Sequence, residues 1–181
     1  MSKVRSETVD PLQIQVFHAF NRCVRRTFLC GVDALSGRDY SHRKQWLRER
    51  LEFLLSIFAF DLATYAIMSN HYHLVLRSRP DVVSSWTDEE VVYRNLRLQG
   101  KRWFRPSGEE RSTTQAEVER IVQDREEVTR IRSKLSDLSH LMAYLNENIS
   151  KQGNKEDEAT GAFWEGTFEA DTLDDEESIL A

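Results

Sequence analysis

The sequence predicts an α+β fold, in which a small antiparallel sheet is flanked by helices and the C-terminal half is mainly helical. Its length of 181 residues suits one domain with its own hydrophobic core. Two β-rich runs, 60–68 and 71–77, are separated only by Ser69 and Asn70, a spacing typical of an antiparallel hairpin. Several other segments repeat apolar residues at intervals of three and four, as amphipathic helices do.

The N-terminal part predicts one strand and one long helix on either side of an exposed loop. The apolar and aromatic run 14–21 is expected to form the first strand, with His18 on its half-buried face. Segment 22–39 contains several arginines and two glycines and should be a loop with a short turn or ribbon within it. Ser41 is a suitable N-cap for an amphipathic helix from about residue 42 to residue 57.

Beyond the second β-rich run the pattern becomes helical. A helix is expected to open at Thr87, because Glu90 follows three residues later in a capping-box arrangement. The charged stretch 114–134 predicts a second helix, which its few apolar residues mark as a solvated spacer. A third helix should run from residue 135 to about residue 152. The closing segment 162–181 begins with aromatic residues and should end as an acidic helix.

Composition excludes several classes of protein. Charged residues make up 30% and aromatic residues 10%, a balance that is too apolar for general disorder. No apolar run reaches the roughly 18 residues that a membrane span requires, so no membrane partner is expected. The N-terminus lacks the apolar stretch of a secretory signal, which makes the cytoplasm the expected location. Cys23 and Cys30 have no C-x-x-C partner pair and are expected to be reduced thiols.

Net charge differs strongly along the chain. Residues 1–79 carry +5, residues 80–150 carry −2 and residues 151–181 carry −8, which together give the overall −5. A globally acidic protein is a poor nonspecific binder of nucleic acids. The basic N-terminal part is nevertheless suited to contacting phosphates, and the acidic end would oppose that contact.

The candidate residues for chemistry are His71 and His73. Residues two apart in a strand present their side chains on the same face, so both imidazoles are within reach of one divalent cation, with Tyr72 opposite. Two histidines leave several coordination positions open, which suits Mg²⁺ or Mn²⁺ at a phosphate oxygen better than a closed zinc site. The alternative is that the pair only lines a polar sheet face. His18, on a neighbouring strand, either approaches the metal or is a packed strand histidine.

Several motifs together resemble one family. The string AIMSNHYHLVLR follows a strand with an H-x-x-x-R pattern, His18 and Arg22, and precedes an LN pair at Leu145 and Asn146 and the element FWEGTFEA. Over about residues 16–170 the sequence resembles the HUH-type transposases with one catalytic tyrosine, above all their REP-associated branch.

The resemblance implies a fold and a mechanism. In this family a hairpin in a ferredoxin-like sheet presents two metal-binding histidines, so His71 and His73 are expected to bind Mg²⁺ or Mn²⁺. A tyrosine on a helix beside the sheet attacks a phosphate of single-stranded or hairpin DNA, while the metal neutralises the developing charge. A 5′-phosphotyrosyl intermediate and a free 3′-OH result, and no nucleotide cofactor is needed. Family members often work as dimers, so a homodimer is a possible assembly.

The sequence departs from the family pattern at the nucleophile. The positions that correspond to it, on the helix after the LN pair, are Ile149 and Gln152, and neither side chain attacks a phosphate. Tyr144 lies one to two turns earlier on the same helix and is the candidate substitute nucleophile, with a core or surface aromatic as the alternative. The family's continuation into an NP motif is absent before Ala181, which indicates a shortened copy.

The candidates for DNA contacts form two groups. The first is a set of arginines suited to gripping phosphates, unless they belong to a solvated loop. The second is a basic-aromatic patch suited to stacking an unpaired base, unless it is a buried helix-end cluster. The residues are Arg22, Arg25, Arg26, Lys101, Arg102 and Trp103. Basic residues that relatives carry in the closing element are replaced by Thr167 and Glu169, which removes two phosphate contacts.

These observations divide the chain into a tail, 1–13, a transposase-like domain, 14–170, with a helical insertion at about 80–134, and an acidic end, 171–181. Three hypotheses on function follow. The first is a transposase that binds single-stranded or hairpin DNA, and the second is a catalytically inactive DNA-binding remnant of such an enzyme. The third is a metal phosphodiesterase that uses activated water in place of tyrosine.

Overall fold

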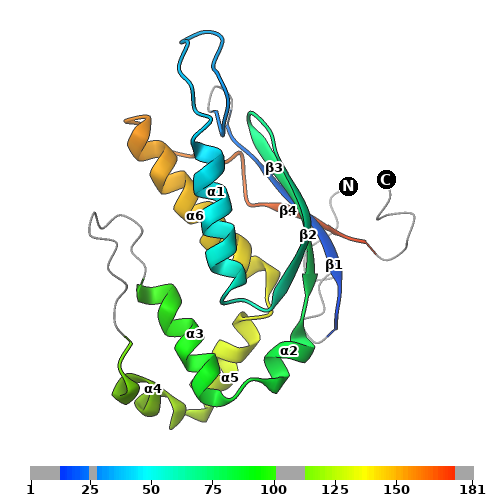
Figure 1. Ribbon diagram of the computed structural model, residues 1–181, viewed down its shortest axis with the longest axis vertical. Coiled ribbons are helices and arrows are strands. Elements are labelled where there is room, and N and C mark those ends of the chain that lie inside the picture. Colours follow the sequence, from blue (N-terminus) through cyan, green and yellow to red (C-terminus); the bar gives the residue numbers. More distant parts are fainter. Residues whose placement is uncertain (1–12, 25–27, 101–112, 174–181) are drawn as a thin grey trace.

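The computed structural model describes residues 13–24, 28–100 and 113–173, and its centre is a four-stranded antiparallel sheet (Figure 1). The strand order is β2-β3-β1-β4. The strands are β1 (Val16–Arg22), β2 (Phe60–Ile67), β3 (His71–Ser78) and β4 (Glu169–Thr172). With the helices described below, this sheet confirms the predicted α+β class.

The predicted hairpin is formed by β2 and β3. Ile67 pairs with Tyr72, and the backbone N–H of Met68 donates to the carbonyl of His71 at 2.8 Å, so Ser69 and Asn70 form the tip as expected. The β-branched and aromatic residues of both runs suit a pleated sheet that is buried on one side.

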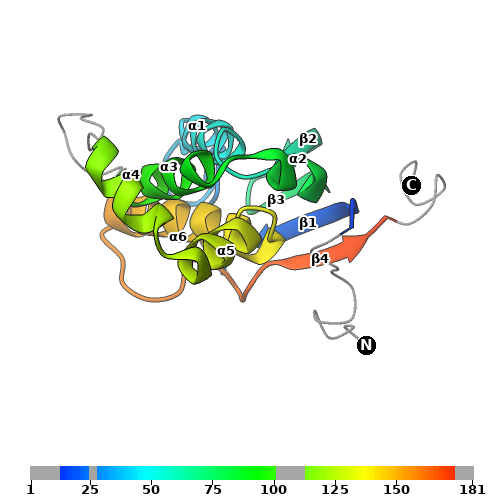
Figure 2. The ribbon, with the colours of Figure 1, turned by 90° about the horizontal axis from the view of Figure 1, so that it is seen from below.

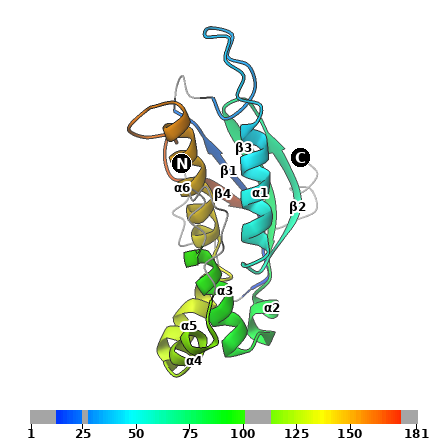
Figure 3. The same cartoon turned by 60° about the vertical axis from the view of Figure 1, so that its left-hand side comes forward.

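Two long helices lie side by side across one face of the sheet (Figures 1 and 3). They are α1 (Arg43–Leu55) and α6 (Leu138–Glu156). A second group of helices gathers beyond one end of the sheet, as Figure 2 shows from below. This group consists of α2 (Pro80–Ser85), α3 (Asp88–Gly100), α4 (Gln115–Val122) and α5 (Arg125–Lys134). No described helix covers the other face of the sheet, which is called the open face below.

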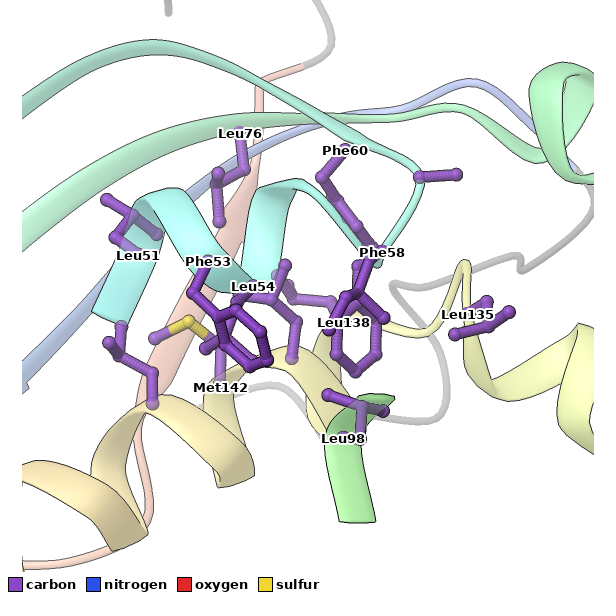
Figure 4. Packing of buried hydrophobic residues seen from close by; sticks show 14 of the residues in the cluster. Leu51, Phe53, Leu54, Phe58, Phe60, Leu76, Leu98, Leu135, Leu138 and Met142 are labelled. Carbon is purple, nitrogen blue, oxygen red and sulfur yellow. The ribbon is translucent and has the colours of Figure 1, made fainter. Parts of the chain in front are cut away.

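One hydrophobic core joins the sheet to both groups of helices. Leu76 of β3 faces Leu51 and Leu54 of α1 and Met142 of α6, and Leu98 extends the same cluster into α3 (Figure 4). Each large apolar side chain that is fully buried contributes about 1.5–3 kcal/mol to stability. The strands take part through alternate residues only, so the remaining side chains of β1 and β3 point to the open face.

Two of the predicted helices differ from those observed. The stretch 114–134 is broken at Asp124, whose carboxylate accepts the backbone N–H of Glu127 and starts a new helix. Its apolar residues Val128 and Ile131 are buried in the core, so the prediction of a solvated spacer is wrong. The last helix continues through Gly153 to Glu156, beyond its predicted end.

The start of α3 agrees with the prediction from the sequence, and the start of α1 differs from it. Thr87 and Glu90 form the predicted capping box, with backbone-to-side-chain bonds of 2.8 and 3.2 Å. Ser41 does not cap α1, because the N-cap is His42 and makes no side-chain capping bond. Ser41 instead donates its backbone N–H to the Asp39 carboxylate at 2.8 Å. The start of α1 is held by the buried Arg43, which donates to the carbonyl of Phe28.

The closing segment forms a strand where an acidic helix was expected. Residues 169–172 pair with β1 as β4, and residues 174–181 lie outside the described part.

Cys23 and Cys30 are free and buried, and burial raises the pKa of the Cys23 thiol to about 12. Among the described residues, no helix combines the length and the apolar character that a membrane crossing needs.

Candidate functional site

His71 and His73 lie on the open face of the sheet, as the alternation of β3 predicts. Their ring centroids are 5.0 Å apart and their planes are nearly perpendicular, at 85°. Tyr72, between them, points the opposite way and is fully buried under the helices. The backbone therefore presents two imidazoles to solvent and one phenol to the core.

The Asn70 side chain fixes the ring of His71. Its Oδ1 lies 2.7 Å from His71 Nδ1, and because an amide oxygen only accepts, Nδ1 carries the hydrogen and Nε2 carries the lone pair. The Asn70 backbone is fixed as well, since its carbonyl accepts the N–H of Cys23 at 2.8 Å. The sequence places Asn70 in the hairpin turn, and the structure adds the contact with His71.

His18 joins this pair from β1. Its Nε2 lies 2.8 Å from His73 Nδ1, and the two rings are stacked with centroids 5.0 Å apart. Burial lowers the pKa of His73 below its usual value, and the neighbouring His18 and His71 lower it further. These effects favour the neutral imidazole, which is the form that binds metals.

The donor set suits an open cation site of two histidines. Both His71 and His73 use Nδ1 in hydrogen bonds to neighbours, which leaves Nε2 of each ring for a cation, an arrangement common around metal-binding histidines. Within the ranges 13–24, 28–100 and 113–173, no group of three or more His, Cys, Asp or Glu side chains is placed to hold a metal. A cation bound by the pair would complete its coordination with water or phosphate oxygens.

Carboxylates border the histidines on β4. Glu169 pairs directly with Phe20, and Asp171 pairs with His18, so both acids lie on the open face. Sequence reasoning missed this neighbourhood because β4 was not predicted. The acids alternate with Ala170 and Thr172 along the EADT segment, so Glu169 and Asp171 share one face once the strand is formed.

Comparison with known proteins was made at the level of families, sequences and structures. No family model matches the chain, and no curated protein matches its sequence. One solved structure that matches is a REP-associated tyrosine transposase bound to a REP hairpin. The match covers 99% of this chain and 67% of the transposase chain, with a TM-score of 0.50 and 10% sequence identity. The chain is similar in fold to this transposase.

Two of the motifs that resemble the transposase family, the LN pair and the FWEG element, hold the fold together. The hydroxyl of Tyr72 donates to Asn146 Oδ1 at 2.6 Å, and Trp164 Nε1 donates to the Asn146 carbonyl at 2.9 Å. The LN pair of α6 and the FWEG element therefore tie β3, α6 and the closing segment into one unit. Their place in this chain is structural.

The candidate substitute nucleophile, Tyr144, lies on the other side of the sheet from the histidines. Tyr144 is on α6, and its ring packs against Phe58 with centroids 6.1 Å apart, on the helix-covered side of the sheet. Ile149 is buried and Gln152 donates to the Asn148 side chain of the same helix. The structure therefore does not bring Tyr144 together with the open face.

One of the predicted DNA-binding residues belongs to the open face. Arg22 is exposed at the end of β1 and pairs directly with His71. The remaining candidates lie outside the described residues: Arg25, Arg26, Lys101, Arg102 and Trp103. Arg22 is thus a cation that the structure places beside the histidine pair.

Proposed function

We propose that this chain is a transposase-type DNA-binding protein, which uses the open face of its sheet to hold single-stranded or hairpin DNA beside a divalent metal ion. The observation that carries the proposal is the pair His71 and His73, which share one face and each have Nδ1 engaged by a neighbour. The similarity in fold to a transposase bound to a REP hairpin supports DNA as the partner.

Each residue of the site has a distinct task in this proposal. His71 and His73 hold Mg²⁺ or Mn²⁺ through Nε2, and the bound cation supplies charge neutralisation at a phosphate oxygen. Arg22 lies directly across from His71, so its guanidinium is positioned to contact the same phosphate or the next one. The contacts are to the DNA backbone and carry no sequence information.

Strand transfer also requires a nucleophile at the phosphate, and Tyr144 is the candidate from the sequence. Its packing against Phe58 on the other side of the sheet favours binding without cleavage. The noncatalytic form of the proposal is therefore the one that the described residues support best. A transposase reaction through Tyr144 is the second form, and the experiment below separates them.

The test is incubation of the purified protein with Mn²⁺ and a labelled hairpin oligonucleotide, analysed on native and denaturing gels. A retarded native band without a shifted denaturing band is the expected result and indicates binding without a covalent bond. A covalent band that disappears in the Tyr144→Phe variant would establish strand transfer instead. Absence of both bands would refute the proposal.

The metal is tested separately from DNA. The His71→Ala and His73→Ala variants are each expected to abolish Mn²⁺ binding in calorimetry while leaving the melting temperature nearly unchanged. His140→Ala is the matched control, because His140 is a half-buried histidine like the pair but lies on α6, away from the open face. Affinity for Mn²⁺ that is unchanged in both variants would remove the metal from the proposal.

The expected homodimer stays a prediction. Analytical ultracentrifugation of the protein with and without the hairpin tests it.

A further inference from the structure

An aromatic ring lies among the histidines on the open face. Phe20 of β1 has its ring centroid 5.4 Å from that of His18 and 5.5 Å from that of His73, with interplanar angles of 31° and 32°. Its side chain is half-buried, although its strand neighbours Ala19 and Asn21 are fully covered by the core. An apolar ring is therefore presented to solvent directly beside the proposed cation site.

The residues across the sheet leave this ring accessible. In the row that crosses the four strands at Phe20, the neighbours are Glu169 on β4, His73 on β3 and Ala66 on β2. Glu169 and Ala66 are both exposed, and the methyl group of Ala66 is too short to reach over the rings. The paired neighbours therefore leave the ring of Phe20 uncovered, and this row of Glu169, Phe20, His73 and Ala66 is called the shelf below.

The shelf has a positive side chain near His73 and a negative side chain next to Phe20. Arg22 lies beside His71, two residues along the strands from Phe20 and His73, and supplies a positive group at the proposed phosphate position. Glu169 lies beside Phe20 on the opposite strand and supplies a carboxylate. A nucleotide has the matching pattern, because its phosphate is an anion and the edges of three of the four bases carry amino groups.

We propose that Phe20 stacks one unpaired base of the bound DNA and that Glu169 accepts a hydrogen bond from the amino group of that base. The inference rests on the proposed function, since it names how the open face would hold its DNA. Aromatic side chains on exposed sheets stack unpaired bases without regard to sequence. The carboxylate adds a preference, because acids accept from the cytosine or adenine amino group, whereas thymine presents carbonyl oxygens that repel them.

Glu169 also gives a reason for one departure from the family pattern. In the family that the sequence resembles, a basic residue that contacts phosphate is expected at this place, and an acid there opposes a phosphate. Directly beside an exposed aromatic ring, the same acid is suited to the edge of a base. The substitution then changes what the position recognises, from backbone to base.

The stacking role is tested with Phe20→Leu, which keeps an apolar side chain but removes the ring, and Phe20→Trp, which keeps a ring. Affinity for a hairpin with one unpaired cytosine should fall roughly 5- to 150-fold in the leucine variant and be retained in the tryptophan variant. Tyr93→Leu is the matched control, because Tyr93 is an exposed aromatic residue on α3. Thermal melting of all three variants verifies that they fold.

The base preference is tested with hairpins that differ only in the unpaired base. The unaltered protein should bind the cytosine and adenine forms about 10-fold more tightly than the thymine form. Glu169→Gln should bring these affinities close together, because an amide both accepts and donates. A hairpin with 5-iodocytosine at the unpaired position should crosslink to Phe20 under ultraviolet light, as peptide mapping would show.

The outcomes separate the two proposals. If the unaltered protein binds no hairpin, the proposed function and this inference both fall. If it binds, but the Phe20→Leu variant binds equally well or the crosslink maps elsewhere, the stacking role alone is overturned. Equal affinity of the unaltered protein for all bases would overturn the role of Glu169.

Discussion

At the scale of single residues, the open face depends on which nitrogen of each imidazole carries its hydrogen. Asn70 determines this for His71, because its Oδ1 only accepts. For His73 the neighbour is another imidazole, His18. Of the two nitrogens that face each other, His18 Nε2 and His73 Nδ1, one must donate the hydrogen and the other must accept it. A metal-binding His73 requires that Nδ1 donates to His18.

Substitution of His18 by phenylalanine removes that acceptor and keeps a ring of similar size. Affinity for Mn²⁺ is expected to fall about 10- to 100-fold, the usual effect of losing a partner behind a metal ligand. Calorimetry measures the change, and His140→Phe on α6 is the control. An affinity equal to that of the unaltered protein would show that His18 has no part in orienting His73.

Tyr72 occupies the other face of the same strand and links the sheet to α6. Its hydroxyl donates to Asn146 Oδ1 at 2.6 Å in a fully buried position. Tyr72→Phe is expected to lower the free energy of unfolding by about 1–2 kcal/mol, since the acceptor loses its partner. Urea denaturation measures the loss, with the exposed Tyr93→Phe as control. A loss no larger than that of the control would contradict the structural role given to the LN pair.

At the scale of elements, α6 and the closing segment fit together at a glycine. Gly153 lies in the last turns of α6, and a Cβ at this position would overlap the ring of Phe163, which is 2% exposed. The helix therefore continues through a residue of poor helix propensity because the close contact excludes every side chain. This contact also explains why the sequence alone placed the end of the helix too early.

Gly153→Ala is expected to destabilise the protein although alanine favours the helix by about 1 kcal/mol. The overlap with a buried ring should outweigh that gain and give a net loss of about 1–3 kcal/mol. The measurement is the melting temperature. Ser150→Ala on the same helix is the control, and Phe163→Leu in the Gly153→Ala background should recover part of the loss. A rise in melting temperature for Gly153→Ala would show that the ring moves freely.

The sequence predicts the elements that depend on residues close together in the chain, and it misses those that depend on contacts between residues far apart in the chain. The hairpin at 60–77 and the capping box at Thr87 depend on residues a few positions apart, which a pattern records directly. The strand β4 has only four residues, two of them acidic, and exists because β1 pairs with it across about 150 positions of sequence. No local pattern contains that partner.

The same distinction applies to the candidate site. The shared face of His71 and His73 follows from the two-residue period of a strand, so the sequence was sufficient. The approach of His18 to His73 joins residues 55 positions apart, and the neighbourhood of Phe20 and Glu169 requires the undetected β4. Metal binding itself, and the role of Tyr144, stay predictions.

At the scale of the whole molecule, charge should decide how tightly DNA is held. The chain has a net charge of −5, and the exposed Thr167 and Glu169 lie in the closing segment, at the two places where the resemblance leads us to expect basic residues. Replacing both with Thr167→Arg and Glu169→Lys changes the net charge from −5 to −2 and adds cations at the edge of the open face. Affinity for a hairpin with an unpaired thymine, which has no amino group for the Glu169 carboxylate to accept from, should rise as a result.

The salt dependence of that affinity is the measurement. Two added phosphate contacts should steepen the slope of log affinity against log salt concentration by about 1.4 for single-stranded DNA. The variant with Glu119→Lys and Thr129→Arg makes the same charge change on the exposed surface of α4 and α5 and is the control. If hairpin affinity rises equally in the two variants, the net charge of the protein determines the effect and the position of the added cations does not.

The short, acidic β4 has a consequence for how copies of this protein behave toward one another. A sheet edge exposes unpaired backbone groups that invite another chain to add a strand, and such additions lead to aggregation. Here β4 offers only four residues and repels an approaching copy with Glu169 and Asp171, while β2, at the opposite edge, is kinked by a bulge between Leu62 and Thr64. Both edges are thereby poor templates, so the sheet can leave one face open to a ligand without joining its neighbours into fibrils.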